Sequence, residues 1–284
     1  MAARETAAAD GEIMHATSEP QFSVCRKVAA AEMEHYEEYG WVKLAGFASP
    51  ALVQTLLRTA RERMGDDGDG NAPYGRNINY FNAERGGGLH IPSMRAYIEE
   101  VGRNAKVLMG RESGVGVRYL LDFFAPKLPS SKKTKNAGNG PTDFHQDFPN
   151  YAVDRSGGMN FWLALEDYGP EFGTMSFVNR SHRRGVVGNY RTFSQESDLF
   201  SVYPEFRKLG LSEPMTYAAG DVTVHSHLTS HGAGSNLTDR PRWAYVVVVQ
   251  PGDVHWTGAP PEAYDTAGWR PFQTFDDERF PIIG

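Results

Sequence analysis

The stretch TDFHQDF, residues 142–148, combines two metal-binding side chains with the composition of a β-strand. Residues i and i+2 of a strand share a face, so His145 and Asp147 can reach one metal ion. A distant His231 could supply a third ligand. Two histidines and one carboxylate on one face of an octahedron leave three positions open, as in non-haem Fe(II) oxygenases. The stretch therefore indicates a metal-dependent oxidation site.

An arginine follows the candidate third ligand. Arg242 opens an apolar stretch that runs to Val249. A guanidinium can bind a carboxylate through two parallel hydrogen bonds. Arg242 could therefore hold the far carboxylate of a 2-oxo acid co-substrate. Arg240 competes for this role, but it precedes Pro241 in a turn and is expected to be exposed.

The residues alone leave the second histidine ligand open. His225 and His227 lie close to His231 in the sequence and share one face of a predicted strand. They could form a metal pair of their own. They could equally be buried residues that hydrogen-bond to the true ligands.

Apolar periodicity and turn residues divide the chain into helices followed by short strands. Ser49 and Pro50 mark a helix start, as N-cap and first helical residue. Helices are predicted over residues 28–39, 50–64 and 93–109, and strands at 41–44, 117–124, 144–148, 159–165, 173–178, 215–218, 221–227 and 242–250. This order predicts an α+β chain dominated by an antiparallel double-sheet barrel.

The domain organisation is expected to be simple. Residues 1–20 are rich in Ala, Glu and Ser and are predicted to form a flexible tail, and residues 21–284 to form one domain. A long polar loop is expected at 127–143. The segment 180–214 could be a lid over a site or an ordinary insertion.

The composition limits the classes of molecule that the protein is expected to bind. A formal net charge of -6 argues against nucleic acid or an anionic membrane surface, so a small-molecule substrate is expected. Cys25 is the only cysteine, which excludes an intrachain disulfide and fits a reducing cytoplasm. The apolar runs are too short to span a membrane. The basic cluster Lys132, Lys133 and Lys135 is either a solvated loop or a contact for phosphate or coenzyme A.

Taken together, the motifs resemble the phytanoyl-CoA dioxygenase family of Fe(II)/2-oxoglutarate oxygenases. The matching segments are YGWVKLAGFASP (39–50), HQD (145–147), WLAL (162–165), GTM (173–175), RSH (180–182) and the run from His231 to Arg242. Met175 replaces a leucine of the family pattern, and Arg180 replaces a glycine.

The resemblance implies a mainly β fold with flanking helices around a double-stranded β-helix, which is a jelly-roll or cupin-like core. It implies that His145, Asp147 and His231 bind Fe(II), with 2-oxoglutarate and O2 as co-substrates. It also implies that Arg242 anchors the 2-oxoglutarate carboxylate and that Trp162 lines the co-substrate pocket.

Three further positions concern this pocket. Ala233 stands where the family often has a serine that assists the arginine. Thr229 is a candidate to supply the missing hydroxyl. Lys127, in the segment Lys127-Leu128-Pro129, resembles a family position beside the co-substrate.

The expected reaction is hydroxylation, with desaturation or rearrangement as further possibilities. Asp147 fills a position that related halogenases leave small, which argues against halogenation. Residues that flank the predicted ligands and could line a substrate pocket are Phe144, Phe148, Asn150, Tyr151 and Trp243. These residues favour a bulky natural-product intermediate as substrate over an acyl-CoA, an amino acid or an osmolyte.

Two alternative functions lie outside the class of Fe(II)/2-oxoglutarate oxygenases. A zinc hydrolase could use the same three ligands, but Arg242 would then have no role. A non-catalytic β-barrel that binds a small ligand would not need all three ligands intact.

Overall fold

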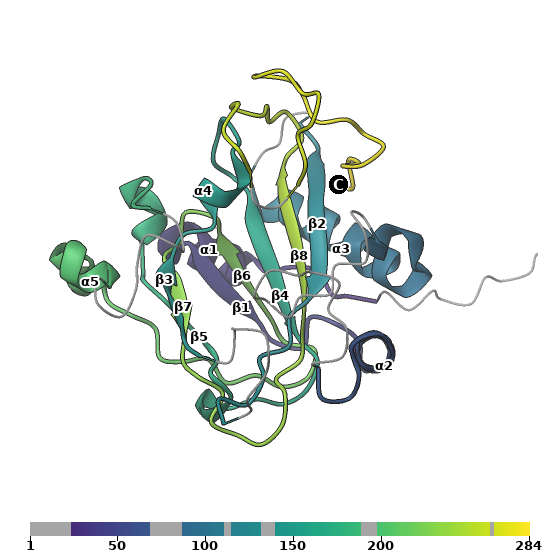
Figure 1. The fold of residues 1–284 in the computed structure, drawn as a ribbon, viewed down its shortest axis with the longest axis vertical. Helices are drawn as coiled ribbons and strands as arrows, with labels where there is room; N and C mark the ends of the chain where they lie inside the picture. The colour runs from purple at the N-terminus through teal and green to yellow at the C-terminus, as the bar shows by residue number, and fades with distance from the viewer. Residues whose placement is uncertain (1–23, 69–86, 111–114, 132–139, 189–197, 262–263) are drawn as a thin grey trace, which may run out of the picture.

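The computed structural model describes residues 24–68, 87–110, 115–131, 140–188, 198–261 and 264–284. Two antiparallel sheets form its centre (Figure 1): a major sheet of order β1-β6-β4-β8-β2 and a minor sheet of order β3-β7-β5. The strands are β1 (Trp41–Leu44), β2 (Val117–Phe124), β3 (Thr142–His145), β4 (Met159–Ala164), β5 (Met175–Phe177), β6 (Val222–Ser226), β7 (His231–Ala233) and β8 (Ala244–Pro251). This double-stranded β-helix with flanking helices confirms the predicted fold class.

Three long helices are present as predicted, and all strands except β1 follow them: α1 (Ala30–Tyr39), α2 (Pro50–Met64) and α3 (Pro92–Leu108). Ser49 caps α2, and its side chain accepts a hydrogen bond from the Leu52 backbone N–H. The shorter elements are α4 (Phe148–Tyr151), α5 (Leu199–Val202), η1 (Gly87–His90), η2 (Pro170–Phe172), η3 (Ser181–Arg184) and η4 (Pro204–Leu209).

The major sheet separates two cores. Along β4, Met159, Phe161 and Leu163 pack into a core shared with α1, α2 and α3. Trp162 points the other way, into the interior between the two sheets. Successive side chains of a strand point to opposite faces, so β2, β4 and β8 contribute to both cores. The inner face is the one that can carry a functional site.

The segment predicted as a lid or an insertion is partly described. Residues 189–197 lie outside the described residues. On either side of that gap, Val178, Val187, Leu199 and Phe206 form a small core of their own. This core lies against the outside of the minor sheet, where Phe200 packs edge-on to Phe144 with ring centroids 5.1 Å apart. The described part therefore resembles an insertion more than a lid.

The predicted strand at 215–218 was wrong. Tyr217 forms only an isolated bridge with Tyr168, outside the named strands. Its neighbours continue into a turn, in which the Ala218 backbone N–H donates to the Asp221 carboxylate; Gly46, which follows β1, donates to the same carboxylate. The side-chain acceptor replaces a strand partner, a competition that local sequence patterns do not reveal.

The C-terminal residues, whose structure was not predicted from the sequence, pair with the first residues of the free edge of β2. Val117 and Tyr119 donate backbone hydrogen bonds to Gly284 and Pro281, and Ile283 donates one to Val117. The buried side chain of Arg118 also donates to the Phe280 carbonyl. The paired part of this edge is not available to another chain.

Arg180 occupies a strained position. Its φ of 59° lies in the left-handed region, which explains the glycine expected there from the family pattern. Its guanidinium donates to Glu38 at 2.6 Å and stacks on the Tyr39 ring. These contacts join η3 to the end of α1.

Other predictions fall on undescribed residues: the tail at 1–20, much of the loop at 127–143, and Lys132, Lys133 and Lys135. In the parts of the chain that the structure describes, no helix has both the length and the apolar character needed to cross a membrane.

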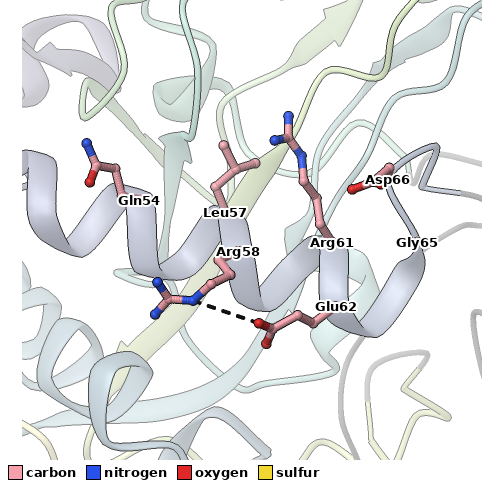
Figure 2. A pocket seen from close by; sticks show the side chains of 7 residues that line it. All are labelled: Gln54, Leu57, Arg58, Arg61, Glu62, Gly65 and Asp66. Carbon is pink, nitrogen blue, oxygen red and sulfur yellow. Dashed lines mark ion pairs between the residues drawn. The ribbon is translucent and has the colours of Figure 1, made fainter.

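A surface hollow lies along α2 (Figure 2). Its lining residues are Gln54, Leu57, Arg58, Arg61, Glu62, Gly65 and Asp66. Arg58 and Glu62 pair across it at 3.8 Å, and both side chains are exposed. It contains none of the residues predicted to act on a substrate, so it is not the candidate site.

Two glycines with positive φ provide a test of the packing around β1. Gly40 has a φ of 82°, and an added Cβ would collide with His182 and Thr229. Gly46 has a φ of 56°, with no described atom within 4 Å of an added Cβ. Gly46→Ala should lower the free energy of unfolding by about 1–2 kcal/mol, and Gly40→Ala by ~1–3 kcal/mol more because of overpacking. Urea unfolding of both variants measures the difference, and equal losses would contradict the predicted collision.

Candidate active site

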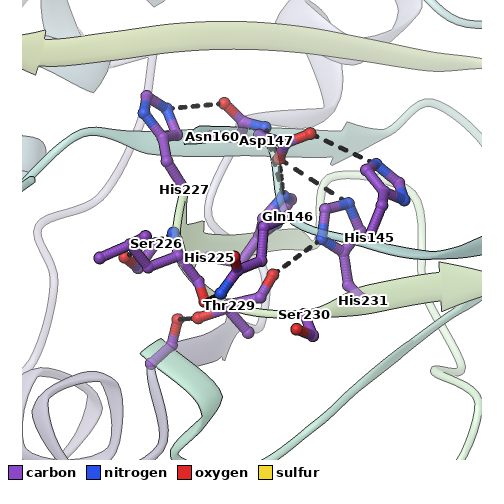
Figure 3. Close-up of polar contacts among 12 residues, drawn as sticks. His145, Gln146, Asp147, Asn160, His225, Ser226, His227, Thr229, Ser230 and His231 are labelled. Carbon is purple, nitrogen blue, oxygen red and sulfur yellow. Dashed lines mark hydrogen bonds and ion pairs between the residues drawn. The ribbon is translucent and has the colours of Figure 1, made fainter. Parts of the chain in front are cut away.

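Three buried side chains meet between the two sheets (Figure 3). The ligand atoms offered by His145, Asp147 and His231 all lie within 4.8 Å of one another. His145 ends β3 and His231 begins β7, and the register of the two antiparallel strands places them directly opposite each other. The structure thus brings the three predicted ligands together.

Asp147 reaches the group by a different route from the one predicted. The strand expected at 144–148 ends at His145, and Asp147 has the helical dihedrals φ −79° and ψ −28° at the start of α4. The Asp147 carbonyl accepts the backbone N–H of Asn150 at 2.9 Å. A turn, not the alternation of a strand, therefore directs this carboxylate at the histidines.

Each of the two histidines is oriented by a backbone carbonyl. His145 Nδ1 lies 2.8 Å from the Asp143 carbonyl oxygen, and His231 Nδ1 lies 3.1 Å from that of Thr229. A carbonyl only accepts, so each Nδ1 carries a proton, and in the neutral ring Nε2 presents its lone pair. His145 Nε2 lies 3.4 Å from Asp147 Oδ1. The tautomer with its proton on Nδ1 is the one that binds a metal through Nε2.

The protonation states of Asp147 and His231 also suit a metal. Burial opposes ionisation of Asp147, but His231, His145 and His225 together hold its pKa well below the usual range. Burial lowers the pKa of His231 to about 3. Burial acts to lower the pKa of His145, but the contact with Asp147, the charges of Asp147 and Asp143 and the Asp143 carbonyl together outweigh burial and raise this pKa. An ionised carboxylate and neutral imidazoles are the forms that coordinate metals, so Asp147 and His231 are already in the binding form, and a protonated His145 would release its Nε2 proton when a metal binds.

Within the described residues, His225 and His227 do not belong to the metal-binding group. His225 Nε2 lies 3.2 Å from Asp147 Oδ2, and His227 Nε2 donates to Asn160 Oδ1 at 3.1 Å. The structure therefore favours the second of their two predicted roles, as residues that hydrogen-bond around a ligand.

The residue between the two ligands points away from them. Gln146 is fully buried, donates to the carbonyls of Gly185 and Leu228 at 2.9 and 2.7 Å, and accepts from the Val187 N–H at 2.9 Å. It thus fixes the segment after η3 to the loop before β7. The sequence did not indicate this role, which depends on contacts with distant segments.

Arg242 is buried and lies beside Trp162. Its guanidinium carbon is 5.0 Å from the Trp162 ring centroid, and its Nη1 donates to the Gly173 carbonyl. Arg240 is instead exposed and pairs with Glu166 at 3.2 Å. The buried position beside Trp162 favours Arg242 over Arg240 as a carboxylate anchor.

Lys127 forms a second buried cation next to Arg242. The two residues exchange backbone hydrogen bonds at 2.9 and 3.0 Å. Lys127 Nζ donates to the Thr142 hydroxyl at 3.3 Å. Burial, assisted by the charge of Arg242, lowers the pKa of Lys127 to about 7. Two adjacent buried cations are suited to an anionic ligand.

The residue best placed to supply the hydroxyl that Ala233 lacks is one that the sequence did not indicate. Thr142 lies directly opposite Ala233 in the β3–β7 register. Thr229, the predicted substitute, donates its hydroxyl to the Gly40 carbonyl at 2.6 Å and its carbonyl oxygen accepts from His231. Thr142 is thus the better placed hydroxyl, and Thr229 orients a histidine.

The candidate substrate residues separate into two groups. Phe148, Asn150 and Tyr151 form α4, directly after Asp147, and the Tyr151 ring lies 4.5 Å from that of His227. Phe144 points to the outer face of the minor sheet, against Phe200. Trp243 is 1% exposed in the helix-side core. Only the α4 residues remain candidates for substrate contact.

Two buried glutamines give a matched test of the contacts around the site. Gln146→Leu leaves three backbone groups without their side-chain partner, among them the buried Val187 N–H, and should cost about 1–3 kcal/mol of unfolding free energy. Gln250 is 0% exposed and its amide has no hydrogen-bond partner among the described residues. Gln250→Leu should therefore be neutral or stabilising. Urea denaturation of both variants is the measurement, and the prediction fails if Gln250→Leu is the more damaging change.

Comparisons with known proteins agree with this geometry. Residues 122–244 match the family described as phytanoyl-CoA dioxygenase (PhyH). No match was found among curated protein sequences.

Three solved structures illustrate the likeness of fold. The carbocyclase SnoK from nogalamycin biosynthesis is 23% identical, with a TM-score of 0.69 over 89% of this chain and 96% of its own. The epimerase SnoN, in complex with Fe3+, alpha ketoglutarate and nogalamycin RO, is 22% identical, with a TM-score of 0.68 over 89% and 98%. EctD from S. alaskensis with bound Fe is 17% identical, with a TM-score of 0.64 over 89% and 92%.

The resemblance inferred from the motifs is thus confirmed: residues 122–244 match the phytanoyl-CoA dioxygenase family, within a chain that has the fold of SnoK, SnoN and EctD.

Proposed function

We propose that this protein is an Fe(II)- and 2-oxoglutarate-dependent dioxygenase that oxidises an unactivated C–H bond of a small molecule. The observation that carries the proposal is the pairing of a buried His-Asp-His group with two buried cations nearby. The donor set of two imidazoles and one carboxylate fits Fe(II). When bound, iron, 2-oxoglutarate and O2 supply the oxidising chemistry.

The cations Lys127 and Arg242 lie near the next pair of facing residues along β3 and β7 from the metal-binding group. On β7, Ala233 is two residues from His231, and Ala233 faces Thr142, the partner of Lys127. Two residues along a strand span about 7 Å. The spacing supports a dicarboxylate that binds the metal at one end and the cations at the other.

The side chains would divide the work of binding. His145, Asp147 and His231 would hold the metal from one side. Arg242 would donate paired hydrogen bonds to the far carboxylate of 2-oxoglutarate, with the Trp162 ring against its guanidinium. Lys127 would add a second positive charge.

The proposed substrate is a natural-product intermediate. Half-buried Phe148 and buried Tyr151 follow directly after Asp147. Two relatives in fold, SnoK and SnoN, come from nogalamycin biosynthesis. As a carbocyclase and an epimerase, they support keeping rearrangement and related reactions beside hydroxylation.

Substitution of Asp147 should abolish metal binding, whereas substitution of Arg242 should weaken the binding of 2-oxoglutarate. Under anaerobic conditions, Fe(II) and 2-oxoglutarate should give a visible charge-transfer band in the wild-type protein. Asp147→Ala should lose metal binding, the band and succinate release. Arg242→Ala should keep the metal but bind 2-oxoglutarate at least ~10-fold more weakly, because a charged hydrogen bond contributes about 1.5–3 kcal/mol.

Arg240→Ala, which removes an exposed arginine, is the matched control and should behave as wild type. A wild-type protein that holds iron yet shows neither the band nor succinate release would refute the proposed function.

The charge of Lys127 should make co-substrate binding depend on pH. Its pKa of about 7 means that Lys127 gains its proton as the pH falls from 8 to 6.5. The protonated form attracts a dianion, so 2-oxoglutarate should bind more tightly at the lower pH. Titrations with 2-oxoglutarate across this range measure the effect. Subtracting the Lys127→Met profile removes contributions from other groups, and identical slopes in the two proteins would contradict the prediction.

A further inference from the structure

The two oxygens of the Asp147 carboxylate have different surroundings. Oδ2 accepts the Asn160 Nδ2 hydrogen at 2.7 Å and lies 3.2 Å from His225 Nε2. Oδ1 lies on the side of His145, 3.4 Å from its Nε2. Oδ2 is thus held by polar side chains of the major sheet, with His231 Nε2 3.8 Å away, and Oδ1 makes the closer contact with a histidine of the metal-binding group (Figure 3).

Sheet register brings the two holding residues together. Asn160 on β4 is the direct cross-strand partner of His225 on β6. Both are buried, and nearby inner-face positions are apolar, including Val246 and Val248 of β8. Buried polar side chains need partners. The partner that Asn160 and His225 share is the Asp147 carboxylate.

The orientation of the Asn160 amide is fixed from both ends. The ionised Asp147 carboxylate only accepts hydrogen bonds, so the NH2 group must face it. The amide oxygen accepts from His227 Nε2 at 3.1 Å. The His227 ring is confined between Tyr151, 4.5 Å away, and Gly158, where an added Cβ would collide with it. The amide therefore cannot reverse without losing both hydrogen bonds.

We infer that Asn160 and His225 are positioning residues that hold Asp147 in an orientation in which only Oδ1 binds the metal. The inference rests on the proposed function and specifies how the site achieves it. A carboxylate with one oxygen held by hydrogen bonds occupies one coordination position in place of two. The three protein ligands then leave three positions for the co-substrate and O2.

The test uses Co(II), bound to the whole protein and followed by chelator competition and by its visible spectrum. Asn160→Leu keeps the approximate volume of the side chain and removes the donor. It should weaken Co(II) binding by about 10–100-fold, as is typical for loss of a group that orients a metal ligand. The visible spectrum should change, because the carboxylate becomes free to rotate.

A matched control separates positioning from structural support. Asn104 on α3 is also buried; it accepts from the Val28 N–H and donates to the Glu100 carbonyl. Asn104→Leu should lower stability and leave Co(II) affinity and spectrum unchanged. If Asn160→Leu does not fold, His225→Phe provides a second variant. The phenylalanine ring can keep the packing of His225 near Phe177.

The outcomes are distinct. Wild-type Co(II) affinity and spectrum in folded Asn160→Leu or His225→Phe would overturn the positioning role and leave the proposed function intact. Equal Co(II) binding by the wild-type protein and Asp147→Ala would mean that the triad is not the metal site. The proposed function itself would then fail.

Discussion

The site depends on the pairing of β3 with β7. These strands are short, yet their register sets His145 opposite His231 and Thr142 opposite Ala233. A slip of one residue would turn a whole strand to the opposite face. The same pairing therefore decides whether two imidazoles face the interior and whether the hydroxyl beside Lys127 lies next to them. Phe177 of β5 lies opposite His231 on the other side of β7 and adds an apolar side chain beside it.

The sequence predicted the chemistry of the site better than its geometry. His145, Asp147 and His231 were identified because their side-chain types and order along the chain are distinctive. The placement of Asp147 on a strand was wrong, because a turn into α4 ends β3 at His145. Local alternation could not reveal this, since the turn depends on backbone bonds from Phe148 and Asn150, one of them to distant His227.

Residues whose roles come from distant contacts escaped prediction for the same reason. Gln146, Asn160 and Thr142 are ordinary polar residues in the sequence, and their functions depend on which segments surround them. Phe144 and Trp243 adjoin candidate residues in the chain but face other cores. The long helices and most strands were predictable because apolar periodicity is a local signal.

The closing of the β2 edge by residues 281–284 has a consequence for how the chain acquires its structure. β2 is synthesised before half of the chain exists, but its edge partner emerges only after all the other strands. Until then the backbone donors and acceptors along that edge face solvent. Pairing between segments so distant in sequence is slow, and open strand edges invite association between nascent chains. Biogenesis of this barrel therefore includes an interval of exposure, during which a chaperone or a low concentration of neighbouring chains protects the yield of native protein.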